Sequence, residues 1–180
     1  AVTSSTDTSV IQLEAVTNQE GRAQVRKYKW EVLIKEGSHT TIAAESQGAM
    51  TTIATDFGRF NNNTLWNRTT DRKYYGPITG SQWQRIKAIV SGGITNYFRI
   101  RGGNLLMSPT PTAGEAVNFE YVSKNWVDTS GGSTANADKF TGDSQTTVLE
   151  EELIVLGVVW RFLKLKGLPY DQQFLEYQTR

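Results

Sequence analysis

The chain has 180 residues, of which 38% are hydrophobic and 21% charged, a composition typical of a folded globular protein and not of a disordered one. Nineteen basic residues and eighteen acidic ones give a net charge of +1, which disfavours a dedicated nucleic-acid-binding domain. The absence of cysteine excludes disulfides, thiolate nucleophiles and thiolate zinc sites. No run approaches the ~18 apolar residues of a membrane span.

Residues 1–29 are expected to form a polar tail followed by a helix. The helix is predicted over Asp7–Tyr28, a segment with few Gly or Pro residues, and its N-cap is one of Asp7, Thr8 or Ser9. Arg26 and Lys27 suit the negative pole of the helix dipole at its end. The apolar side chains expected on its buried face are Val10, Leu13, Val16 and Ala23.

Residues 30–127 have the period and composition of β structure. Strands are predicted around 30–34, 40–42, 50–53, 97–101, 105–107 and 115–127, and Gly102-Gly103 is expected to turn a tight hairpin. In the last of these strands, one face should carry Val117, Phe119, Tyr121 and Ser123. A short helix is expected over 79–90, with Trp83, Ile86 and either Ala88 or Val90 pointing inward.

Residues 128–145 are rich in Gly and Ser and predict a linker loop, and residues 146–180 predict a C-terminal helical segment. Thr147 and Glu150 match a capping box for its helix. Heptad spacing predicts a packing seam of Leu149, Leu153, Leu156, Trp160 and Leu163. The expected architecture is therefore α+β, with terminal helices that pack together and an inserted small β-sheet domain.

No set of residues has the spacing of a catalytic or metal site, so we expect a protein that is not an enzyme and has no cofactor. A single imidazole, His39, cannot supply a triad or a histidine-rich metal site and is expected to be a surface or packing residue. Glu150, Glu151 and Glu152 are interpreted as the charged first turn of a helix. Asp56-Phe57-Gly58 matches a kinase metal-binding triplet, but the rest of that signature is missing.

Aromatic and basic side chains suggest contact surfaces. Trp83 and Trp160 fall on apolar helical faces, which predicts core packing, whereas interface positions are expected for Trp66, Tyr74, Tyr75 and Trp126. Charges that could face a channel or a neighbouring subunit are Arg68, Arg72, Lys73, Arg99 and Arg101. After Gly167, a partner-binding tail is predicted from the apolar side chains Leu168, Tyr170, Phe174 and Tyr177.

Several segments resemble the head–tail adaptor (connector) proteins of tailed bacteriophages, especially the short-tailed ones. The resemblance lies in segments spread between about residue 10 and residue 178: 18–22, 28–30, 60–68, 97–103, 109–114, 119–127, 149–153 and 160–162. None of these segments is a catalytic motif, so the resemblance rests on the length of the chain, the order of these segments along it and their residue composition. Family members begin with an additional helix, whereas residues 1–9 here are polar.

The resemblance implies a structural virion protein of the neck region, assembled in the host cytoplasm. Its expected partners are further copies of itself in a dodecameric ring, the portal protein, the tail nozzle or tube protein, and DNA that passes during ejection without sequence-specific binding. No membrane contact is expected. Two other readings stay open, a carbohydrate-binding or accessory β module of a phage tail that uses exposed tryptophans, and a cell-wall hydrolase of the virion.

Overall fold

The structure is a computed structural model that describes residues 7–89, 95–132 and 134–180. The fold is α+β, with terminal helices and a curled β-sheet. The chain divides into two compact units. The helical unit combines the residues up to Leu33 with Lys124–Arg180, and the β unit is Ile34–Ser123. The β unit therefore begins and ends about four residues inside the range 30–127 expected for the insertion.

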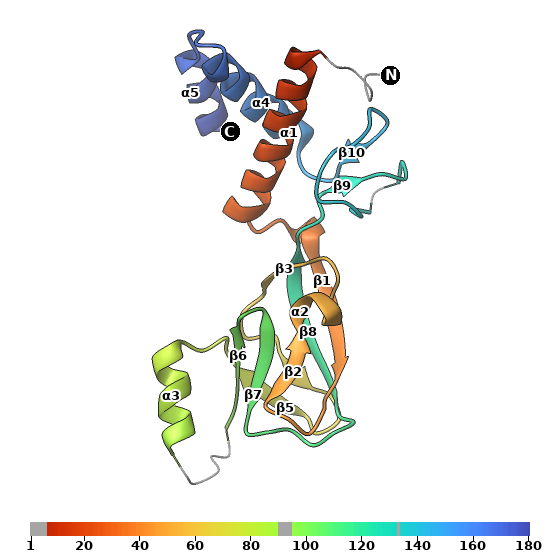
Figure 1. Ribbon diagram of the computed structural model, residues 1–180, viewed down its shortest axis with the longest axis vertical. Helices are drawn as coiled ribbons and strands as arrows, with labels where there is room; N and C mark the ends of the chain where they lie inside the picture. Colours follow the sequence, from red (N-terminus) through yellow and green to blue (C-terminus); the bar gives the residue numbers. More distant parts are fainter. Residues whose placement is uncertain (1–6, 90–94, 133) are drawn as a thin grey trace. The chain divides into compact units, whose positions relative to one another are not determined.

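The helical unit is built from α1 (Thr8–Lys27), α4 (Glu151–Leu165) and α5 (Asp171–Thr179), as Figure 1 shows. The carboxylate of Asp7 caps α1 by accepting a hydrogen bond from the Ser9 amide at 2.7 Å. Because Lys166 bonds to Gln12 while Gly157 lies against Glu20, α1 and α4 run antiparallel. The chain turns at Gly167, which has a φ of 69°, and α5 folds back on α4.

The buried face of α1 differs from the apolar stripe predicted from the sequence. Leu13 is 44% exposed. Val16 is buried as predicted, and Val10 and Ala23 are half-buried. The other buried positions are Asn18, Glu20, Gly21 and Gln24. The prediction failed because polar side chains can be buried where specific hydrogen bonds satisfy them, and apolar periodicity does not detect such positions.

The predicted capping box of α4 is wrong. Thr147 lies in β10 (Thr146–Thr147), which pairs with β9 (Val127–Asp128). The Thr147 hydroxyl accepts from the Leu149 amide at 3.0 Å, and the helix itself starts only at Glu151. The Thr147 hydroxyl thus shapes the turn that leads into α4, which is a local alternative to capping.

Residues 128–145, expected to be a linker or a loop, are largely irregular, and their described part packs within the helical unit. The Phe140 ring meets the Trp126 ring edge-on at 5.0 Å, and the Trp126 indole N–H donates to the Asp138 carbonyl. From α1, the Asn18 amide bonds the Phe140 backbone through both its oxygen and its nitrogen. The Trp126 ring also covers Gly21, where an added Cβ would lie 2.1 Å from the ring.

In the β unit, eight described strands form one sheet in the order β1-β8-β4-β5-β6-β7-β2, with β3 also paired to β8. All described pairings are antiparallel except β5 with β6. The strands are β1 (Ile34–Thr40), β2 (Ser46–Ala49), β3 (Phe57–Phe60), β4 (Trp66–Asn67), β5 (Arg72–Tyr75), β6 (Asn96–Arg101), β7 (Asn104–Ser108) and β8 (Ala116–Ser123). The expected Gly102-Gly103 hairpin joins β6 to β7, and both glycines have positive φ.

Local patterns failed at three predicted strands. Of residues 40–42, only Thr40 lies in a strand, as the last residue of β1, which runs through Gly37. Residues 31–33 form a short 3-10 helix (Glu31–Leu33), so β1 begins at Ile34. Residues 50–53 form α2 (Met50–Ile53), a single helical turn whose first amide bonds the Gly103 carbonyl of the hairpin. Their β-branched composition was overridden by this tertiary hydrogen bond and by the full burial of Met50.

The helix predicted over 79–90 is α3 (Gly80–Ala88), with a capping box between Thr79 and Gln82. Trp83 is 1% exposed as predicted, Ala88 is exposed, and Val90 lies outside the described residues. The predicted inward face of β8 is confirmed, since Val117, Phe119, Tyr121 and Ser123 are all buried.

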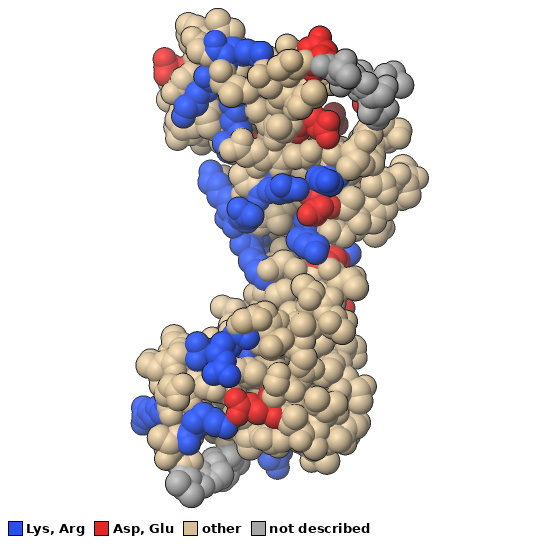
Figure 2. Space-filling model, viewed as in Figure 1, with Lys and Arg blue, Asp and Glu red and all other residues tan. Residues whose placement is uncertain are grey.

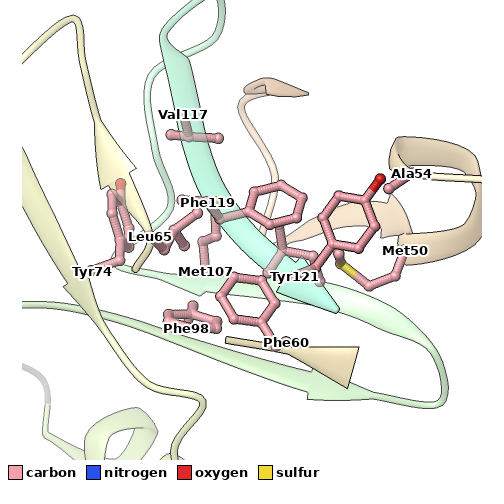
Figure 3. Packing of buried hydrophobic residues seen from close by; sticks show 11 residues of the cluster. Met50, Ala54, Phe60, Leu65, Tyr74, Phe98, Met107, Val117, Phe119 and Tyr121 are labelled. Carbon is pink, nitrogen blue, oxygen red and sulfur yellow. The ribbon is translucent and has the colours of Figure 1, made fainter. Parts of the chain in front are cut away.

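The core of the β unit lies between β8 and the strands around it (Figure 3). The Phe60 ring packs between two others, with ring centroids 4.7 Å from Phe98 and 5.0 Å from Phe119. Gly37 on β1 admits the Phe119 ring, because a Cβ there would lie 2.6 Å from the ring. The opposite, outward side of β8 is therefore free to carry polar residues.

Candidate functional site

A buried polar cluster joins the three helices of the helical unit. The Glu20 carboxylate on α1 is fully buried and pairs with Arg161 on α4. It also accepts from the Tyr177 hydroxyl of α5 at 2.8 Å and from the Gln24 amide at 2.6 Å. Gly157 makes room for it, since a Cβ there would lie 2.3 Å from the Glu20 carboxyl carbon. One carboxylate thus fixes α1, α4 and α5 together.

The phenol of Tyr177 is held in its neutral form by this cluster. Burial, its hydrogen bond to Glu20 and the negative charge of Glu20 raise the pKa of Tyr177 to about 12. No local pattern predicts the cluster, because Glu20 and Arg161 are 141 residues apart.

Three of the four apolar side chains of the predicted partner-binding tail pack within the chain. The rings of Tyr170, Phe174 and Tyr177 surround Trp160, with centroids at 6.2, 4.9 and 5.9 Å. Leu168 is 51% exposed, and Leu175 on α5, which the sequence did not single out, is 60% exposed. The outward apolar surface of this tail therefore comes from leucines and not from its aromatic rings.

The predicted helix seam lies partly inside the helical unit. Leu149, Leu153 and Trp160 are buried, whereas Leu156 and Leu163 are half-buried. Ile154 and Gly157 are buried as well, although the heptad pattern did not include them. The buried face of α4 is broader than a heptad seam because α1 and α5 cover different sides of it.

Exposed apolar side chains are numerous on the helical unit. Val155 and Val159, one helical turn apart on α4, are 51% and 40% exposed. The others on its helices and tail are Ile11, Leu13, Val32, Leu165, Leu168 and Leu175. The single chain therefore leaves several large apolar side chains of this unit in contact with water.

Basic side chains follow α1 and the end of α4. Arg22, Arg26 and Lys27 are exposed on α1, as are Lys164 and Lys166 at the end of α4. Figure 2 shows Lys and Arg side chains recurring over the visible face of this unit. The sequence predicts Arg26 and Lys27, and likewise Lys164 and Lys166, as partners of the helix dipoles at the ends of their helices.

The five basic residues singled out in the β unit do not form one stripe. Arg68 pairs with Glu36 at 2.7 Å, and Lys73 lies over the Tyr75 ring. Consecutive residues of a strand face opposite sides, so Arg72 and Lys73 of β5 point apart. On β6, Arg99 is half-buried near Gly80 at the start of α3, and Arg101 is exposed beside the hairpin turn.

Asp56 is the first residue of the triplet that matches a kinase metal-binding motif. In the structure it joins two strands of the β unit. Its carboxylate accepts from Lys35 of β1 at 2.6 Å, and from Tyr121 and Ser123 of β8 at 2.6 and 2.8 Å. Burial alone would raise the pKa of Asp56, but these hydrogen bonds and the Lys35 charge outweigh it and lower the pKa to about 2. The role of Asp56 is structural, since all its partners belong to the fold.

A hollow of about 330 Å³ opens on the outward side of the β unit. Trp66 of β4 stands in it with 47% of its surface exposed, while the side chains of Trp83, Trp126 and Trp160 are buried. The rest of the lining is mostly polar: Glu36, Asn63, Thr64, Arg68, Asn118 and Glu120, with Phe119. This is the one sequence-predicted contact tryptophan that lies in a surface hollow among the described residues.

His39 lies on β1 opposite Val117. Across residues 7–89, 95–132 and 134–180, no three His, Asp or Glu side chains come together in a way that could hold a metal ion. Within those same ranges, no helix has the length and apolarity needed to cross a membrane.

Comparison with models of known protein families finds no match to this chain, and comparison with curated proteins finds none either.

Proposed function

We propose that this chain is a head-to-tail adaptor of a tailed bacteriophage, a subunit of a ring that joins the portal to the tail nozzle or tube. In this proposal the protein is structural, carries out no catalysis, and lines part of the channel through which DNA leaves. The sequence resemblance to adaptor proteins suggested this function, and the α+β fold with paired terminal helices agrees with what that resemblance implies.

The observation that carries the proposal is the exposed apolar surface of the helical unit. Val155, Val159, Leu168 and Leu175 remain in water in a single chain. Burial of apolar surface stabilises association by about 25 cal/mol per Å² before the costs of association are subtracted, so such side chains favour assembly. In a ring, each subunit presents one surface to its neighbour and another to the protein above or below.

The basic surface of α1 supports the part of the proposal that concerns DNA. Arg22, Arg26 and Lys27 are exposed there. Positive charge at a channel wall attracts the phosphate backbone of DNA and does not distinguish one base sequence from another. The overall charge of +1 agrees with transient passage of DNA and not with tight binding.

The test is capture of the chain by the portal ring of the same virus. Replacement of both exposed tail leucines, Leu168→Asp with Leu175→Asp, is expected to abolish capture, because each aspartate places a charge in an apolar contact. A matched control adds the same negative charge to exposed positions of α5 without removing apolar surface, as Gln172→Glu with Gln178→Glu. The control should be captured like the native chain.

Two results would contradict the proposal. Either the native chain is not retained by portal rings under conditions in which its fold is intact, or the leucine variant is retained as well as the control. Electron microscopy of the retained complex checks that bound chains form a ring.

A further inference from the structure

We propose that the hollow around Trp66 in the β unit binds a neutral saccharide. The proposal does not rest on the adaptor function, because it concerns the outward face of the sheet alone. It assigns Trp66 as the platform on which a sugar ring lies, and the polar side chains around it as partners for the sugar hydroxyls.

The register of the sheet brings these side chains to one face. Trp66 on β4 lies directly opposite Asn118 on β8, and Glu120 follows two residues later on the same face of β8. Glu36 on β1 lies directly opposite Glu120, on the other side of β8. Three adjacent strands thus place one indole and several carboxylate and amide groups around a single hollow.

The chemistry of the hollow fits a sugar better than an apolar ligand. One face of a pyranose presents C–H groups of partial positive charge, which pack on the negative face of an indole ring. Around its edge a sugar presents hydroxyls that both donate and accept hydrogen bonds. Carboxylates accept such bonds, an amide does both and a guanidinium donates them, so the lining offers each type of partner.

These polar groups bond to one another in the free chain, although Arg68 and Glu36 stay more than half exposed. The Glu36 carboxylate accepts from Asn118 at 2.7 Å and pairs with Arg68 at 2.7 Å. The Glu120 carboxylate accepts from Asn61 at 2.6 Å. Side chains fixed by their neighbours lose less conformational freedom on binding, which favours affinity for a small polar ligand.

The charge of the hollow selects the class of saccharide. Two carboxylates, Glu36 and Glu120, face one guanidinium, Arg68. The excess negative charge disfavours phosphorylated, sulfated and sialylated sugars. Hexoses and N-acetylhexosamines, which carry no charge, are therefore the expected ligands.

The experiment measures binding of maltohexaose, cellohexaose and chitohexaose to the full chain by saturation-transfer NMR and calorimetry, in the absence of portal. At least one of these oligosaccharides is expected to bind with millimolar or tighter affinity. Trp66→Ala should weaken that binding roughly tenfold or more, equivalent to the loss of about 1.4 kcal/mol. Trp66→Tyr should retain part of it, because an aromatic face remains.

Tyr75→Ala is the matched control, since Tyr75 is an aromatic residue of β5 with nearly the same exposure, 48%, and does not line the hollow. Its affinity for the oligosaccharide should equal that of the native chain. The proposal is overturned if none of the three probes binds, or if Trp66→Ala binds as tightly as the native chain. Absence of sugar binding together with loss of portal capture in Trp66→Ala would instead assign Trp66 to a protein contact and leave the adaptor proposal standing.

Discussion

At the scale of single residues, one carboxylate with several partners organises each unit, and it is fully buried at Glu20 and half-buried at Asp56. Asp56 in the β unit and Glu20 in the helical unit each accept three hydrogen bonds or ion pairs from more than one element. A buried carboxylate is costly unless it is fully paired, so each cluster stabilises only the arrangement in which all its partners are present. This makes both residues sensitive positions.

Asp56→Asn is expected to lower the free energy of unfolding at pH 7 by about 1–3 kcal/mol, because the amide cannot replace the charge-assisted bond from Lys35. Chemical denaturation measures the change. Thr55→Asn, at the exposed neighbouring position, should have little effect.

Lowering the pH tests the stabilising charge of Asp56 in a second way. The pKa of Asp56 is about 2 in the folded chain and 3.8 ordinarily, so its contribution is complete above about pH 4 and is lost as the pH falls through 2. The native chain and the Asp56→Asn variant should therefore converge in stability at low pH. An equal stability difference at pH 7 and at pH 2 would show that the carboxylate charge is not what stabilises the fold.

At the scale of elements, the close approach of α1 and α4 depends on Gly157. In an exposed helix interior, Gly→Ala stabilises by roughly 1 kcal/mol through helix propensity. At Gly157 the added methyl would lie 2.3 Å from the Glu20 carboxyl carbon, and it would disturb the bonds of Glu20 to Arg161 and Tyr177.

We therefore expect Gly157→Ala to reverse the usual sign and lower the free energy of unfolding by about 1–3 kcal/mol, as overpacking does. Thermal and chemical denaturation followed by circular dichroism measure it. Val159→Ala, at an exposed position of the same helix, should be nearly neutral. A stabilised Gly157→Ala variant would mean that the helices do not pack as closely as the structure has them.

The elements that could be predicted from the sequence are those specified by local chemistry. The Gly102-Gly103 hairpin, the helix around Trp83 and the inward face of β8 all follow from turn residues and periodicity. The helical turn at Met50 was missed because its first amide bonds the distant Gly103 carbonyl. The start of α4 was missed because Thr147 pairs with Val127 in a strand and its hydroxyl bonds the Leu149 amide before the helix begins.

The candidate sites were less predictable than the elements, because they depend on strand register and on distant pairs. Trp66 was identified as a contact residue, but the polar hollow around it forms only when β1, β8 and β4 align. The apolar residues of the tail were predicted to face a partner protein. In the structure its aromatic rings pack on Trp160 of the same chain. The sequence shows where apolar side chains occur but not whether they pack inside the chain or stay exposed to a partner.

At the scale of the whole molecule, the insertion leaves the helical unit continuous in space although it is interrupted in sequence. The first and last strands of the β unit pair with each other, with Ile34 opposite Val122, so the chain enters and leaves that unit at neighbouring points. The N-terminal and C-terminal segments can thus form one packed unit on their own. Such an arrangement gives one chain two independent surfaces, as a ring subunit with two kinds of neighbour requires.

The most direct test of the adaptor proposal is the mass of the portal ring with and without this chain, measured by light scattering after size-exclusion chromatography. At saturation the account predicts a gain of one 20.1 kDa chain for each portal subunit, with the complex eluting as a single species. Because every contact repeats around the ring, binding should rise steeply with concentration to this full occupancy. A portal ring whose mass stays unchanged at saturating concentrations of the folded chain would contradict the account.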